Sequence, residues 1–263
     1  MSQPETNLES SRPAPNVLLI ALRRPRWRNA IDTALLVALR GMLDRAAGDD
    51  DVHCVVLTGD DRSFSAGADI HEMHEGGLAV LQNLERLEAW AAIEHFPKPL
   101  IAAVNGFALG SGNELALLCD IIVAGESALF GQPEVQLGGM PGDGGTQRLV
   151  FAVGKSRAMQ MILAGVPIDA PTALACGLVS EVIAPTHTVE RAVEIAACIG
   201  KASPAATQAA KRAILQSFEL PLAEGLARER QAMLDLAATP ERAAGLSAFA
   251  NRQGCHNAGR RSE

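Results

Sequence analysis

Residues 98–114, KPLIAAVNGFALGSGNE, form the stretch that decides the fold of this chain. The first half contains a short apolar run, residues 100–104, which follows two prolines and is typical of a buried strand. The second half places Gly110 and Gly112 directly before an apolar helical pattern. The stretch therefore predicts a strand that leads through a glycine-rich turn into a helix, with Glu114 in the first turn of that helix.

The segments on either side repeat this alternation of strand and helix. Short β-branched runs lie before and after a helical pattern that Asp32 caps and that ends before Gly48. Such an alternation predicts an α/β core. The predicted strands are 17–22, 52–58, 100–104, 121–124 and 178–183, and the predicted helices are 32–47, 79–94, one from about 112, 204–218, 221–238 and 240–252.

The chain is expected to have three parts. Residues 1–15 have no apolar stretch and are predicted to be a flexible tail, and residues 16–200 carry the α/β pattern. Residues 201–263 are predicted to be a helical region. The apolar stripes of its helices are too large for so small a region to bury within itself, so we expect them to pack on a neighbouring subunit.

Composition excludes several classes of protein. The 263 residues are 48% hydrophobic, which suits a large buried core, and no run approaches the roughly 20 apolar residues of a membrane helix. The net charge of -7, without a run of basic residues, disfavours nucleic acid as a partner. Five scattered cysteines favour neither disulfides nor a zinc site. Without a signal-peptide pattern, the sequence predicts a cytoplasmic protein.

Two glycine-rich segments point to an anion-stabilising site. Residues 110–112 and residues 66–69 could each direct unpaired backbone N–H groups at a developing negative oxygen. Two such donors from separate segments would form an oxyanion hole, which suits chemistry through a thioester enolate. Ordinary tight turns are the alternative for either segment.

Glu114 and Glu134 are the candidate catalytic acid and base. Glu114 lies in an apolar helical pattern, where a charged side chain needs a partner, and Glu134 follows Pro133. Two carboxylates in one pocket can divide the work, because one can take a proton while the other holds a proton to give. Surface or helix-capping glutamates are the alternative.

Other motifs do not meet their requirements. Residues 154–156 resemble the end of a phosphate-binding loop, but Leu149 stands where the first glycine is needed. The two histidines of residues 71–75 are three apart rather than four, which favours a solvated helix over a zinc site. Residues 142–145 lack the third glycine of a dinucleotide fingerprint. Metal, nicotinamide and nucleotide-hydrolysis chemistry are therefore not expected.

The chain resembles the crotonase (enoyl-CoA hydratase/isomerase) superfamily from about residue 17 to residue 252. The resemblance implies a spiral of ββα turns over residues 16–200 and a C-terminal helical region used in trimer formation, commonly within a hexamer. It implies an acyl-CoA thioester substrate and no metal or redox cofactor, because coenzyme A is part of the substrate. The segments that carry it are residues 65–70, 98–106, 131–134 and 141–149.

The resemblance also assigns roles to residues. Ala68 and Ser111 match the backbone donors of the family's oxyanion hole. Glu114 matches the base that activates water for attack on C3 of a trans-2-enoyl-CoA, and Glu134 matches the acid that protonates C2. Contacts to substrate and coenzyme A are expected from Arg26, Trp27, Arg28, Arg62, Ala66, Gly67, Asp69, Ile70, Gly110, Pro133 and Gly142, with Arg28 or Arg62 on the phosphates.

Three residues depart from the family pattern. Ser111 replaces a small residue, Asn113 stands where cysteine is frequent, and Asp143 replaces the usual alanine. A third carboxylate near the pair could raise the proton affinity of a glutamate or hydrogen-bond to substrate.

The first functional prediction is a cytoplasmic enoyl-CoA hydratase. Some scaffold segments, such as residues 225–230, are most similar to the hydratases of bacterial phenylacetate breakdown that act on 2,3-dehydroadipyl-CoA. A double-bond isomerase, which would use chiefly Glu134, is the second prediction. A noncatalytic relative that binds RNA or a protein partner is the third, and salt-sensitive RNA binding would support it.

Overall fold

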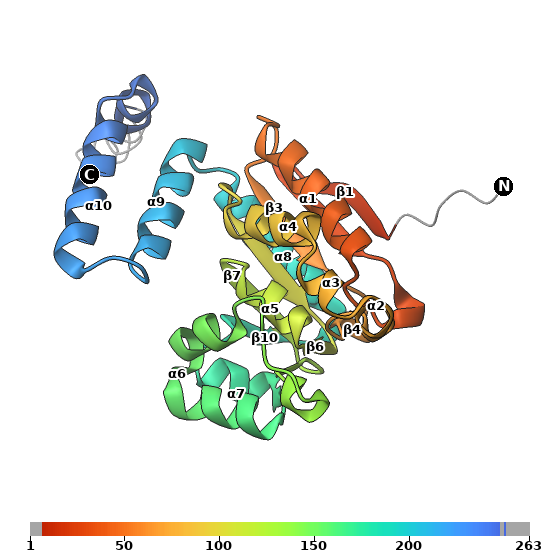
Figure 1. Ribbon diagram of the computed structural model, residues 1–263. Coiled ribbons are helices and arrows are strands. Elements are labelled where there is room, and N and C mark those ends of the chain that lie inside the picture. Colours follow the sequence, from red (N-terminus) through yellow and green to blue (C-terminus); the bar gives the residue numbers. More distant parts are fainter. Residues whose placement is uncertain (1–6, 248–249, 251–263) are drawn as a thin grey trace, which may run out of the picture. The chain divides into compact units, whose positions relative to one another are not determined.

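In the computed structural model, which describes residues 7–247 and 250, the chain forms two compact units (Figure 1). Among the described residues, those up to Lys201 form the first unit and those from Ala202 onward form the second. The first unit holds all the strands and eight α-helices among the described residues, whereas the second is helical.

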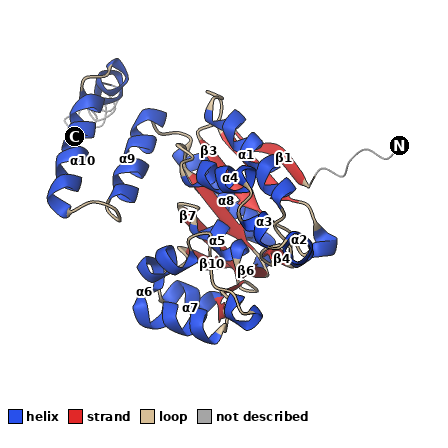
Figure 2. Ribbon diagram, viewed as in Figure 1, coloured by secondary structure: helices blue, strands red, loops and turns tan. Residues whose placement is uncertain are grey.

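Two sheets form the framework of the first unit. One has six strands in the order β1-β2-β3-β5-β7-β10, and the other has four in the order β4-β6-β8-β9. Figure 2 shows helices on both sides of the larger sheet. The strands are β1 (Leu8–Ala14), β2 (Val17–Leu22), β3 (Cys54–Thr58), β4 (Ser63–Ser65), β5 (Leu100–Val104), β6 (Phe107–Leu109), β7 (Ile121–Gly125), β8 (Leu129–Gly131), β9 (Ile168–Asp169) and β10 (Glu181–Ile183).

Successive strands alternate between the two sheets. The first strand of each pair β3/β4, β5/β6 and β7/β8 joins the six-stranded sheet, and the second joins the four-stranded sheet. Each strand pairs in parallel with the equivalent strand of the next turn, as β3 does with β5 and β4 with β6. A helical segment follows each pair. This arrangement is the predicted spiral of ββα turns.

The helices begin and end largely where capping residues and glycines predict. In the first unit they are α1 (Thr33–Ala47), α2 (Ile70–Gly76), α3 (Leu78–Leu81), α4 (Leu84–Glu94), α5 (Ser111–Leu117), α6 (Gly145–Ala164), α7 (Ala170–Ala175) and α8 (Thr188–Ile199), with 3-10 turns η1 (Pro25–Trp27), η2 (Glu134–Leu137) and η3 (Pro185–His187). The second unit contains α9 (Pro204–Gln216), α10 (Leu222–Ala237) and a helical stretch over residues 240–247. No helix in the described part of the chain has the length and apolar character needed to span a bilayer.

The inner strands of the six-stranded sheet are buried on both faces. Val55 and Leu57 of β3 belong to the larger core, which includes the apolar side of α1. Cys54 and Val56 point the opposite way, into a second core that Ala192 and other residues of α8 complete. Burial on both faces explains why the strands read as continuous apolar runs rather than as alternating patterns.

Several predicted boundaries differ from the structure. Residues 8–14, placed in a flexible tail, form β1, which pairs antiparallel with β2 as a mostly exposed edge strand. The single helix over 79–94 is two helices, because Asn83 caps the start of α4 with its side chain. The strand over 178–183 begins only at Glu181. The predicted helix over 240–252 lies partly outside the described residues.

Gly106, in the turn between β5 and β6, provides a test of the spiral. It adopts φ +60°, and a Cβ atom there would lie 1.8 Å from the carbonyl oxygen of Arg62. We expect Gly106→Ala to lower the free energy of unfolding by about 3 kcal/mol or more, from backbone strain and overlap. Urea unfolding of the two proteins measures the difference. The control is Gly225→Ala in α10, where a Cβ meets open space and a gain in helix propensity is expected. A Gly106→Ala protein as stable as the wild type would contradict this account.

Candidate active site

Glu114 lies in the first turn of α5 and is only 1% exposed. Its Oε1 atom accepts hydrogen bonds from the backbone N–H groups of Asp143, at 2.9 Å, and Gly145, at 2.7 Å. Gly145 is the first residue of α6, where a backbone N–H has no partner within its own helix. A carboxylate buried in α5 is thus held by the start of another helix.

The surroundings of Glu114 favour its protonated form. Burial is the largest cause, and it raises the pKa of the carboxyl from the ordinary 4.5 to about 7. The hydrogen bond from Gly145 acts in the opposite direction, while the charges of Asp143 and Glu134 raise the pKa further. A carboxyl with a pKa near neutral can both take and return a proton at physiological pH.

Glu134 is the first residue of η2, directly after β8, and is half-buried. Burial also raises its pKa above the ordinary value, and the charge of Asp143 contributes. The side-chain amide of Gln132 is buried, and one of its two orientations gives both its nitrogen and its oxygen a partner. In that orientation it donates to Glu134 Oε1 at 2.8 Å and accepts from Asn113 Nδ2 at 3.2 Å. The fold therefore brings Glu114 and Glu134 into one electrostatically coupled group.

The two glycine-rich segments approach each other closely. Gly67 has φ +110° and Gly110 has φ +52°, and a Cβ on Gly67 would lie 2.9 Å from the carbonyl oxygen of Leu109. Ala68 and Ser111 each follow one of these glycines. In the part of the chain that the structure describes, neither of their backbone N–H groups donates to a protein acceptor. The segments thus bring two available donors near the carboxylates.

Asp143 connects the carboxylates to a buried arginine. Its Oδ2 atom accepts from Ser111 Oγ at 3.1 Å and lies 3.5 Å from Nη2 of Arg86, a residue of α4 that is only 2% exposed. Sequence reasoning missed Arg86. The signal was available, because Arg86 takes the first place in a buried stripe that continues with Ala89, Trp90 and Ile93.

The predicted coenzyme A residues of η1 and its C-cap form an exposed turn. Arg26, Trp27 and Arg28 are exposed, and the Arg28 guanidinium lies 5.5 Å above the ring of Phe107. The Trp27 ring contacts the ring of His71 edge-on, at 5.3 Å between centroids. The turn therefore presents two arginines and an aromatic face to solvent.

Asp69 has structural partners. Its carboxylate pairs with Arg24 at 3.0 Å and caps α2 by accepting from the N–H groups of His71 and Glu72. Burial acts to raise the pKa of Asp69, but the bonds from Arg24 and the helix N–H groups outweigh it and hold the pKa below its ordinary value. Arg24 also pairs with Asp32 at 2.9 Å, so this cluster fixes the turn that carries the exposed arginines.

The remaining predicted contacts lie at different depths. Arg62, Ile70 and Gly142 are exposed, whereas Ala66 and Pro133 are half-buried. Ala66 donates its N–H to the carbonyl of Arg28, and Phe107 donates to the carbonyl of Arg62 at 3.3 Å. Arg62 is thus joined through its backbone to Phe107, the residue whose ring lies beneath the Arg28 guanidinium.

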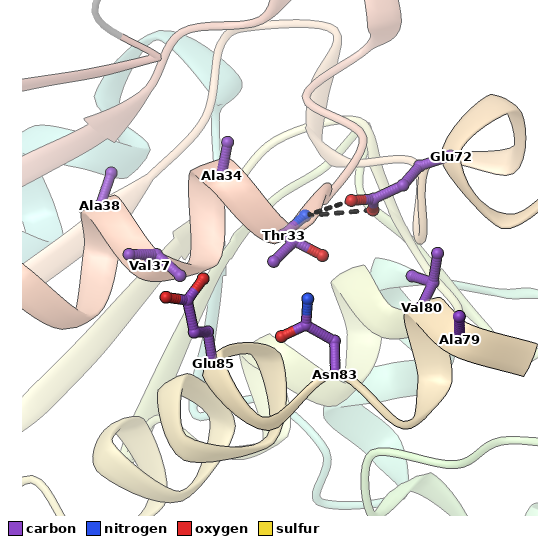
Figure 3. A pocket seen from close by; sticks show the side chains of 9 residues that line it. All are labelled: Thr33, Ala34, Val37, Ala38, Glu72, Ala79, Val80, Asn83 and Glu85. Atoms are coloured by element: carbon purple, nitrogen blue, oxygen red, sulfur yellow. Dashed lines mark hydrogen bonds between the residues drawn. The ribbon is translucent and has the colours of Figure 1, made fainter. Parts of the chain in front are cut away.

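A separate open groove lies between α1 and the segments α2 to α4 (Figure 3). Glu72 crosses one end, where both of its carboxylate oxygens accept from the N–H of Thr33 at 3.1 Å. Glu114, Glu134 and Asp143 do not line this groove. Among the described residues, no cluster of three or more side chains has the composition of a metal site.

The raised pKa of Glu114 predicts a pH-dependent stability. Because the folded state holds the proton more tightly than the unfolded state, burial of the ionised carboxylate costs free energy. This cost is absent below pH 4.5, grows as the pH rises and is complete above pH 7. We expect Glu114→Gln to gain roughly 2 to 3 kcal/mol relative to wild type between pH 4.5 and pH 8, measured by urea unfolding. The exposed Glu75→Gln is the control, and a pH-independent difference for Glu114→Gln would refute the assignment.

Comparison with known proteins gives a consistent result. The family described as "Enoyl-CoA hydratase/isomerase" matches residues 13–259. The chain is 52% identical over 237 residues to a 2,3-dehydroadipyl-CoA hydratase of Escherichia coli, covering 90% of this chain and 93% of that protein. It is 42% identical to a mitochondrial enoyl-CoA hydratase of Pongo abelii, covering 89% of this chain and 81% of that protein.

Solved structures agree with the sequence relatives. The crystal structure of an enoyl-CoA hydratase from Bacillus anthracis superposes with a TM-score of 0.90 at 37% identity, covering 94% of this chain and 97% of that one. The predictions of the fold and of an enoyl-CoA hydratase, a hydro-lyase, are thereby confirmed. The chain belongs to the enoyl-CoA hydratase/isomerase family, the crotonase superfamily.

Proposed function

We propose that this protein adds water across the 2,3 double bond of a trans-2-enoyl-CoA at the site that Glu114 and Glu134 form. The product is a 3-hydroxyacyl-CoA. The observation that carries the proposal is the buried carboxyl of Glu114, which accepts two backbone hydrogen bonds and lies close enough to Glu134 for the two charges to interact. Two available backbone donors lie beside them, as a reaction through a thioester enolate requires.

The proposed roles are those that the family resemblance implies for these two positions. Ionised Glu114 takes a proton from water while the water oxygen bonds to C3, and the electrons of the double bond move onto the thioester oxygen. The N–H groups of Ala68 and Ser111 stabilise that oxygen, and losing one such donor typically costs on the order of 100-fold in rate. Protonated Glu134 then gives its proton to C2, which restores the thioester. None of these reaction steps is an oxidation or a reduction, so the proposed reaction needs no redox cofactor.

Loss of either carboxyl should abolish hydration. We expect Glu114→Ala and Glu134→Ala to lower kcat by on the order of 100-fold to 10,000-fold, because each removes a proton-transfer group. The measurement is the loss of enoyl-thioester absorbance with crotonyl-CoA, with Glu75→Ala as the surface control. Because Glu114 acts as a base and Glu134 as an acid, wild-type kcat/KM should depend on pH as a bell, with one limb set by the Glu114 pKa of about 7 and the other by the ionisation of Glu134. Wild type that moves the double bond of a 3-enoyl-CoA but hydrates nothing would support an isomerase instead.

Arg28 or Arg62 is proposed to bind the phosphates of coenzyme A, with Arg26 and Trp27 lying along the adenine and pantetheine. All four side chains are exposed, and Arg28 is held over Phe107. The contacts that we propose from Ala66, Gly67, Ile70, Gly110, Pro133 and Gly142 would follow the pantetheine and thioester.

This assignment predicts a change in KM. The double variant Arg28→Ala/Arg62→Ala should raise KM for crotonyl-CoA about tenfold or more and leave kcat nearly unchanged, because phosphate contacts act equally in the ground and transition states. Crotonyl-pantetheine, which lacks the nucleotide, is the matched control substrate. Its KM and kcat should be the same for the double variant as for wild type. Equal losses with both substrates would indicate damage to the site itself.

The second unit is proposed to form contacts between copies of this chain in a homotrimer, with a hexamer as a further possibility. Its helices expose large apolar side chains that such contacts would cover. The exposed apolar side chains of these helices are Ile214, Leu215, Phe218, Leu222, Leu226, Met233 and Leu234.

We also propose that the protein is cytoplasmic and that it acts without a metal ion and without nucleic acid.

A further inference from the structure

Arg86 is a buried cation that the proposed reaction does not use. Its side chain is 3% exposed, and among the described residues Asp143 is the carboxylate with which it forms an ion pair. Its Nη1 atom is buried and has no hydrogen-bond partner. A buried guanidinium needs a nearby anion, because removal from water is costly for an unpaired charge. Asp143 supplies that anion from within the chain.

Asp143 also touches the reaction machinery. Its backbone N–H donates to Glu114, and its carboxylate accepts from the hydroxyl of Ser111, the residue whose N–H is proposed to hold the thioester oxygen. Burial raises the pKa of Asp143, while the Arg86 charge and the Ser111 hydroxyl favour the ionised form. Asp143 thus lies between the buried cation and the groups that contact C1 and C3 of the substrate.

The proposed attack on C3 brings the acyl chain beside Glu114, whose carboxylate accepts from the backbone N–H of Asp143. In a six-carbon substrate the terminal atom is three bonds beyond C3, a span of roughly 4 Å. A carboxylate at that end would meet the ionised side chains of Glu114 and Asp143, while the arginine beside them already has Asp143 as its partner. Like charges at such distances repel strongly when water is excluded.

We propose that Asp143 occupies Arg86 in the place of a substrate carboxylate, so that the enzyme selects uncharged acyl chains over chains of equal length that end in a carboxylate. The inference rests on the proposed hydratase function. The preferred substrate of this chain would then differ from the dicarboxylic substrate for which its E. coli relative, a 2,3-dehydroadipyl-CoA hydratase, is named. The pair would therefore determine specificity without taking part in proton transfer.

The test compares two six-carbon substrates that differ in one group. Hex-2-enoyl-CoA ends in a methyl group, and 2,3-dehydroadipyl-CoA ends in a carboxylate. For wild type we expect kcat/KM to favour the hexenoyl substrate by about tenfold or more, which corresponds to about 1.4 kcal/mol. Asp143→Asn keeps the size of the side chain but frees Arg86, and should reduce this ratio at least about tenfold or reverse it. Asp143→Ala also frees Arg86, and it shows whether the amide introduced by Asp143→Asn contributes to the change in the ratio.

A second substitution identifies the group responsible. In the Asp143→Asn background, Arg86→Met should remove the gained activity on 2,3-dehydroadipyl-CoA and spare activity on the hexenoyl substrate. A general packing defect would lower both activities together. The wild-type ratio requires no variant, so the proposal stays testable if a variant does not fold.

The outcomes separate the two proposals. Wild type that uses both substrates equally, or prefers the dicarboxylic one, would overturn the role of Asp143. So would a ratio that Asp143→Asn leaves unchanged. Absence of hydration of either substrate by wild type would instead overturn the hydratase function on which the inference rests.

Discussion

The hydrogen bonds from the start of α6 to the carboxylate of Glu114 are the constraint on which the site depends. They join α5, which follows one turn of the spiral, to the helix that follows the next. No side chain fits at Gly145, because a Cβ there would lie 2.5 Å from the amide of Gln132 and 3.0 Å from Glu114 Oε1. One contact therefore fixes the Glu114 carboxylate, the glycine run and the position of Asp143.

The depth of this contact determines its chemistry. α5 lies among buried residues, so Glu114 loses the water that would stabilise its charge, and backbone N–H groups replace only part of that hydration. Glu134 sits on a short 3-10 turn closer to solvent. The two carboxyls thus differ because the fold places one inside a helix and the other at the end of a strand. Unequal environments thus give two identical functional groups different proton affinities.

Much of the fold could be predicted from sequence because local signals agree with the final packing. The boundaries of β2, β5 and α1 follow from apolar runs and from the Asp32 cap. β1 could not, since only Leu8 of its seven residues is buried and the strand is held by pairing with β2. Asn83 is a good helix-capping residue, but it stands within a longer helical pattern. Tertiary contacts decide whether the helix continues through such a residue or begins again after it.

The site was predictable only in part. The glycines at 67 and 110 indicate from sequence that the backbone comes close to another group at these positions. The sequence does not show which group this is, because it belongs to another turn of the spiral. The contact between Glu114 and residues 143–145 spans about thirty positions and has no local signature. Arg86 was overlooked because an arginine on a helix is ordinarily solvated, and only its place in the buried stripe distinguishes it.

The order of strands in the six-stranded sheet has a consequence for synthesis on the ribosome. Along the sheet the strands follow the chain, β1-β2-β3-β5-β7-β10, so each emerging strand meets an edge that is already complete. Parallel pairing across long connections is slow when strands must search a whole free chain. Here vectorial emergence removes most of that search, because the growing edge offers one partner at a time. The sheet is suited to assemble in the direction of translation, with β10 as its last strand.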